Sequence, residues 1–183
     1  LGIERMMHGV HALEGLLTDD DRKMLRRVLL SECDWLEGCQ VKAGLVENNK
    51  PESNIWNGAI LYRTAALYPD YEKASDYRAK AAQFFVNGIS VPSDQDSEDL
   101  YDGYRVQDLF VGANFFDTYA LNHHRYMNVG YMVICLSNIA MLHFAFRQAG
   151  ESAPLAIYHH AKELWRLVRT MTFGDGRLLR IGG

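Results

Sequence analysis

The sequence lacks the signatures of several large protein classes. Its three cysteines are an odd number in 183 residues, so they give no disulfide framework, and we expect them to be reduced and packed. It contains no glycine-rich phosphate loop, no GxSxG nucleophile elbow and no CxxC pair. These absences remove the usual sequence evidence for a nucleotide-binding protein, an α/β-hydrolase or a thiol oxidoreductase.

Neither positive nor negative charge dominates the sequence. The chain carries 19 Lys and Arg against 23 Asp and Glu, a net charge of -4, with no stretch dominated by either sign. This balance argues against nucleic acid or an anionic membrane as a partner. The longest apolar stretch, residues 131–146, is shorter than the ~20 residues of a membrane span and contains Ser137, Asn138 and His143. We therefore expect no membrane partner.

Localisation stays open in the sequence. No secretion signal is visible in a chain that starts at Leu1, and reduced thiols favour a reducing compartment such as the cytoplasm.

Helical periodicity is abundant. Thr18, followed by three aspartates, is a good N-cap, and Gly88 is suited to a left-handed C-cap. Apolar spacing and these punctuating residues predict six helices, over residues 3–17, 18–38, 53–68, 71–87, 128–148 and 152–171.

The connections alternate between short and long. One or two residues join the helices within each pair, whereas about a dozen (residues 40–52) and nearly forty (residues 89–127) separate the pairs. Short connections produce antiparallel neighbours, so both long loops should gather at one end, which we call the rim. We predict one all-α domain over residues 1–183, made of consecutive antiparallel helical hairpins. We expect it to be a fragment of a larger (α/α) toroid that self-associates through exposed helix flanks.

Residues 117–131 hold the first chemical cluster. It combines histidine, which can act as a base near neutral pH, with phenolic proton donors and with amide and guanidinium groups that can neutralise a carboxylate. The alternative is a polar loop that caps the fifth helix. The candidate residues are Asn122, His123, His124, Arg125, Tyr126 and Tyr131.

Two further clusters should lie on the same rim. Around the start of the third helix, amides and an indole resemble sugar-binding chemistry, and the alternative is helix capping by Ser53 or Asn54 with Trp56 in the core. After the sixth helix, Asp175-Gly176 predicts a small hairpin presenting Arg177 and Arg180 to an anion, or simply a solvated turn. The candidate substrate-binding residues are Glu47, Asn48, Asn54, Trp56, Asn57, His124, Arg125 and Arg177.

A metal site and a cofactor are not expected. His159 or His160 with Glu163 has a spacing that suits a metal, but no third ligand is evident nearby in sequence.

A family resemblance rests on short motifs. The Asn-Ile-Trp-Asn helix start at 54–57, Leu-Tyr-Pro-Asp at 67–70, and Asn122-His123 followed by Tyr126 and Tyr131 resemble the toroid domain of heparinase II/III-like polysaccharide lyases, or a related uncharacterised toroid family. The resemblance implies β-elimination on a uronic-acid polysaccharide. Asn122 would neutralise the substrate carboxylate, His123 would act as base or neutraliser, and Tyr126 or Tyr131 would protonate the leaving oxygen.

Two other functions remain open. A hydrolase on a similar toroid needs a pair of carboxylates, for which Glu47, Glu52 and Asp117 are candidates. A non-catalytic helical binding or scaffold module would use the aromatic loops as an interface. The expected partner is a poly- or oligosaccharide, acidic if the lyase interpretation holds.

Overall fold

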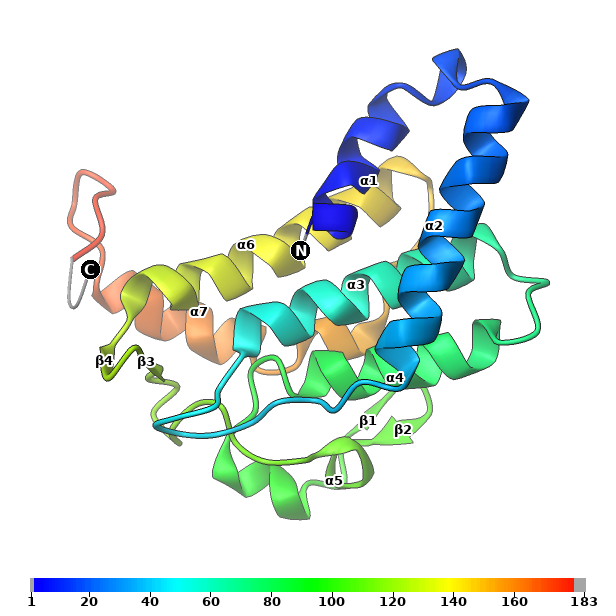
Figure 1. The fold of residues 1–183 in the computed structure, drawn as a ribbon. Coiled ribbons are helices and arrows are strands. Elements are labelled where there is room, and N and C mark those ends of the chain that lie inside the picture. Colours follow the sequence, from blue (N-terminus) through cyan, green and yellow to red (C-terminus); the bar gives the residue numbers. More distant parts are fainter. Residues whose placement is uncertain (1, 180–183) are drawn as a thin grey trace.

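The computed structural model describes residues 2–179 and is mainly α-helical, as the periodicity predicts (Figure 1). The strands of the described residues are two short antiparallel pairs, both in the long connection between the fourth and fifth predicted helices. The helices of at least ten residues are α1 (Gly2–Ala12), α2 (Asp19–Glu37), α3 (Pro51–Leu67), α4 (Ala74–Val86), α6 (Val129–Gln148) and α7 (Ala161–Thr170). The shorter elements are η1 (Glu14–Leu16), η2 (Pro92–Asp96), β1 (Leu100–Tyr101), β2 (Tyr104–Arg105), α5 (Val106–Leu109), β3 (Asn122–His123), β4 (Tyr126–Met127) and η3 (Leu155–Tyr158).

Helix α3 is the centre of the fold. It packs against α1, α2, α4 and α6, and twelve of its seventeen residues are buried. Its apolar residues surround the helix instead of forming one stripe, which is typical of a helix enclosed by others. Gly58 makes the tightest of these contacts possible, because a Cβ there would lie 2.7 Å from the Phe85 ring of α4.

Local capping signals predicted two helix starts well. The Thr18 hydroxyl accepts from the Asp21 N–H, and the Asp21 carboxylate accepts from the Thr18 N–H at 2.9 Å, which forms a capping box. Asn128 caps α6 by accepting from the Tyr131 N–H at 3.1 Å. Both interactions lie within one helical turn, so the local sequence suffices to specify them.

Two predicted helix caps were wrong. Helix α3 begins at Pro51, which suits the first helical position, so Ser53 and Asn54 lie inside it instead of capping it. Gly88 has no positive φ. Packing explains the glycine at this position, because a Cβ there would lie 2.6 Å from a side-chain carbon of Ile55.

The predicted sixth helix is divided into η3 and α7. The Asp102 carboxylate accepts from the Leu155 and Ala156 N–H groups at 3.0 and 2.9 Å and so starts η3. His160 then adopts a left-handed conformation, φ 52°, before α7 begins. A carboxylate more than fifty positions away thus starts η3, and the break itself lies at His160.

Three buried asparagines hold the long connections to the helices. Asn54 of α3 donates to the Lys42 and Asn87 carbonyls, both at 2.8 Å. Asn114 donates to the same two carbonyls at 3.1 and 2.7 Å. Asn87 donates to the Leu109 carbonyl and accepts from the Val111 N–H. These side-chain bonds satisfy loop backbone groups that have no partner in a helix or sheet, and they give the irregular loops defined positions.

Helix α6 is longer than the apolar stretch seen in the sequence. Its 20 residues are long and apolar enough to cross a bilayer by length and composition alone. In the structure it packs against α3 and α7 and is partly buried. Its buried residues are Val129, Met132, Cys135, Asn138, Ile139, Leu142 and Phe146.

Several helix flanks present large apolar side chains to solvent. Trp35 of α2 is 65% exposed and Trp165 of α7 is 53% exposed, with Met24, Val28 and Phe144 also exposed. Self-association through these flanks stays a prediction, as does closure of the helices into a toroid.

Candidate functional site

Two predicted clusters meet where α3 and β3 come together. Asn49, just before α3, faces His123 of β3, with its side-chain oxygen 2.5 Å from His123 Nδ1. The same amide donates its N–H to the Asn122 carbonyl. Both Asn49 and His123 are buried. The two loops that precede α3 and α6 are therefore joined by one bond between side chains and one from side chain to backbone, which agrees with the expected position of both on one rim.

The Asn49 amide determines the state of the imidazole. The amide nitrogen donates to the Asn122 carbonyl, so the amide oxygen faces His123 and accepts a hydrogen bond from the Nδ1–H group. The lone pair of the neutral ring is then on Nε2, which makes no hydrogen bond within residues 2–179. Burial lowers the pKa of His123, despite an opposing effect of Glu52. A neutral imidazole with an unshared Nε2 lone pair is what a general base requires.

Aromatic rings surround this imidazole. The Tyr131 ring lies 4.1 Å from the His123 ring, and the His124 ring lies 4.2 Å from it, centroid to centroid. Tyr126 is paired with His123 through the backbone of the β3–β4 hairpin. His124 and Arg125 form the turn of this hairpin with positive φ values of 59° and 71°, and both are exposed. Tyr131 is thus the tyrosine whose ring contacts the imidazole.

Glu52 adds an unpaired carboxylate oxygen to the site. The residue is 5% exposed; its Oε1 accepts from Ser53, and its Oε2 is buried without a partner among the described residues. It lies close enough to counter the fall in the His123 pKa and to raise the pKa of the Cys135 thiol, which burial already raises. The start of α3 therefore brings a negative charge towards His123.

The remaining predicted residues divide between solvent and structural positions. Glu47, Asn48 and Arg177 are exposed, and Asn57 is half-buried. Asn54 is 1% exposed, and both its N–H groups serve backbone carbonyls. Arg5 lies over the Trp56 ring at 5.5 Å, so α1 occupies one face of that indole.

The third predicted cluster forms the expected small hairpin. Thr172 and Leu178 make an antiparallel bridge, and the Phe173 N–H donates to the Arg177 carbonyl at 2.8 Å. The Arg177 guanidinium pairs with Asp175 at 2.7 Å. Together with Val129 and Gly130 at the start of α6, this hairpin lines an open cavity, so it also lies at the rim. Arg180 lies outside the described residues.

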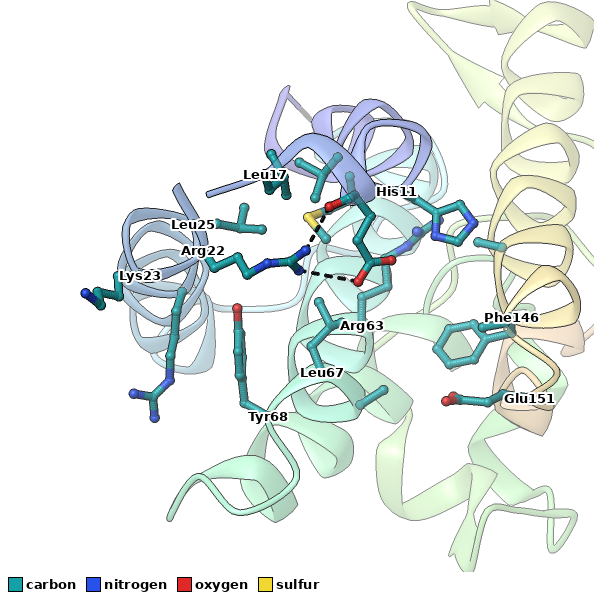
Figure 2. A pocket seen from close by; sticks show the side chains of 17 residues that line it. His11, Leu17, Arg22, Lys23, Leu25, Arg63, Leu67, Tyr68, Phe146 and Glu151 are labelled. Atoms are coloured by element: carbon teal, nitrogen blue, oxygen red, sulfur yellow. Dashed lines mark hydrogen bonds and ion pairs between the residues drawn. The ribbon is translucent and has the colours of Figure 1, made fainter. Parts of the chain in front are cut away.

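A second cavity lies at the opposite end of α3 and α6 (Figure 2). It measures about 490 Å³ and opens between the α1–α2 hairpin and the C-terminal ends of α3 and α6. Arg22 crosses it to Glu14, at 2.8 Å from the carbonyl and 3.5 Å from the carboxylate. Arg63 and Glu151 also line it. No local sequence pattern indicates this cavity, because four separate helices contribute to it.

A third group of polar side chains is centred on the buried Asp94. Its two carboxylate oxygens accept from Nε2 of His159 at 3.0 Å and from Nε2 of His160 at 2.8 Å. The Val91 N–H also donates to it at 2.9 Å. The imidazole contacts hold the pKa of Asp94 well below its usual range against the opposing effect of burial. Tyr119 lies against His160, its hydroxyl 3.3 Å from Nδ1.

Asn49, Glu52 and Asp94 were not predicted as site residues of the favoured function. Asn49 stands inside the motif that pointed to the α3 start, so its position was a usable signal. Asp94 lies 65 residues before His159, and no local pattern connects them. The His159-His160 doublet was visible, but its partner required the tertiary structure.

Comparisons with models of protein families, with curated proteins and with solved structures found no significant match.

Proposed function

We propose that the chain is a carbohydrate-active helical domain of the (α/α) toroid type, whose His123 site promotes β-elimination on a uronic-acid polysaccharide. One observation carries the proposal: Asn49 orients His123 with its Nε2 lone pair unshared, directly beside the Tyr131 ring. Antiparallel helices, with long connections meeting at one end, support the toroid interpretation.

The chemistry assigns a role to each group. Loss of the C5 proton from a uronate is difficult until the charge of the adjacent carboxylate is offset, so a neutraliser must lie beside a base. His123 Nε2 takes the C5 proton, and the Asn122 side-chain amide binds the carboxylate. The Tyr131 hydroxyl protonates the leaving glycosidic oxygen. Tyr126, on the neighbouring strand, is the alternative proton donor.

The test is turnover of polymers that contain glucuronate, iduronate, galacturonate or mannuronate. Elimination creates a conjugated double bond, which ultraviolet absorbance detects directly. We expect His123→Gln and Tyr131→Phe to lower the rate by roughly 100-fold or more. The matched controls are His143→Gln and Tyr68→Phe. His143 bonds Tyr158, and Tyr68 lies beyond the opposite end of α3, so both variants should keep the wild-type rate.

Other outcomes identify the competing functions. Reducing ends without ultraviolet absorbance would indicate a hydrolase, for which Glu52 is the first carboxylate to replace. Polymer binding without either product would indicate a binding module. Absence of both turnover and binding by folded protein across the panel would refute the carbohydrate proposal.

A further inference from the structure

We propose that Asp94, His159 and His160 form a zinc-binding site. These residues play no part in the proposed lyase chemistry, so the two proposals stand or fall separately. Asp94 comes from η2, after α4, whereas the two histidines come from the junction of η3 and α7. The fold thus brings three metal-ligating side chains together from two distant segments.

The distances suit a single ion. One ligand atom from each residue lies within 4.8 Å of the other two. The Nε2 atoms of His159 and His160 lie 3.0 and 2.8 Å from separate oxygens of Asp94. Zinc bonds of about 2.0–2.2 Å in tetrahedral geometry place neighbouring ligand atoms roughly 3.3 Å apart. An ion can therefore replace the two hydrogen-bonding protons with only a small expansion of the cluster.

Hydrogen bonding alone leaves the cluster incomplete. His159 is 2% exposed, and its Nδ1 is buried with no partner among the described residues. A buried polar nitrogen without a partner is uncommon and needs an explanation. With an ion at Nε2, the neutral His159 ring carries its proton on Nδ1, which still has no partner within residues 2–179, so this atom does not distinguish an ion from a hydrogen-bonded cluster.

The surroundings favour a cation and provide supporting contacts. The Val91 N–H fixes one oxygen of Asp94, and the Tyr119 hydroxyl lies beside Nδ1 of His160, where it can orient the ring. Asp99 lies near His159, and its carboxylate adds negative charge. The His160 side chain is 20% exposed, which gives an ion a path from solvent.

The ligand set indicates the coordination. Two imidazoles and one carboxylate are a donor set that zinc accepts, and three protein ligands leave a fourth position for water. The ion would join η2 to the start of α7, so its binding should also stabilise the fold.

The experiment titrates chelator-treated protein with zinc, using a chromophoric chelator as competitor, and records the melting temperature in parallel. We expect one zinc per chain and a higher melting temperature. His160→Gln should weaken binding by at least about tenfold, because the loss of even a supporting contact commonly costs that much. His143→Gln and His123→Gln should bind zinc as the wild type does.

Cobalt provides a readout that needs no variant. Cobalt bound in the wild-type protein should give the visible absorption bands of a tetrahedral complex, and zinc should abolish them. Wild-type protein that binds zinc no more tightly than folded His160→Gln would overturn the proposal, as would the absence of cobalt bands. Loss of lyase activity in His123→Gln with zinc binding retained would show that the two sites are independent.

Discussion

Replacing the buried asparagines by alanine tests whether they hold the long connections in place. Asn54→Ala removes two hydrogen bonds of 2.8 Å, to the Lys42 and Asn87 carbonyls. At about 1 kcal/mol each, their loss should lower the free energy of unfolding by about 2 kcal/mol. Asn87→Ala removes three bonds and deprives the Val111 N–H of its acceptor, so about 3–4 kcal/mol is expected.

Urea denaturation followed by circular dichroism measures these losses. In a chain of this length, they correspond to falls in melting temperature of about 4–8 °C for Asn54→Ala and about 6–16 °C for Asn87→Ala. Asn57→Ala is the matched control: Asn57 lies on the same helix as Asn54, is half-buried and makes no side-chain hydrogen bond within residues 2–179. Its effect should stay within about 0.5 kcal/mol.

The result that would refute this reasoning is an Asn54→Ala variant as stable as Asn57→Ala. If that variant also bound a polymer more weakly, Asn54 would be a substrate-binding residue, as the sequence predicted. A stability loss with unchanged polymer affinity per folded molecule would instead establish its structural role.

Two further predictions concern packing and pH. Gly58→Ala should destabilise the protein by about 1–3 kcal/mol, because the new Cβ would lie 2.7 Å from the Phe85 ring. Gly9→Ala is the control, since a Cβ at Gly9 would have nothing within 4 Å, and it should not destabilise the protein. Equal melting temperatures of the two variants would contradict this prediction. Burial lowers the pKa values of His8 and His123 in the folded protein. As the pH falls below about 6.5, these histidines therefore bind protons more readily in the unfolded chain than in the folded one, which favours unfolding. Urea unfolding should therefore reveal lower stability at about pH 5.5 than at about pH 7.5, and an unchanged midpoint would argue against it.

Much of the helical architecture was predictable because its signals are local. Thr18 and Asn128 cap their helices through bonds to residues three positions along, and Gly150 ends α6 with a φ of 75°. The start of α3 at Pro51 is also a local signal, whereas two other predictions failed because a distant contact replaced the local preference. Gly88 allows the close packing of Ile55, and His159 and His160, at the break in the predicted sixth helix, bond to Asp94 from another part of the chain.

The sequence predicted which loops form the candidate site but not which side chains contact one another within it. The alternation of short and long connections placed the polar loops at one end, and the Asn49–His123 contact agrees with that placement. The tautomer of His123 depends on an amide 74 residues away in sequence, so no local pattern encodes it.

The sequence by itself determined the helical segments, the presence of polar loops between them and the chemical groups available for function. Only the tertiary structure decided which groups meet: His123 with Asn49 and Tyr131, and Asp94 with the His159-His160 pair. Helix formation depends on bonds within one turn, which sequence spacing describes directly. A site depends on the packing of whole helices, where an ångström of displacement separates a hydrogen bond from no bond, and that packing is a property of the entire core.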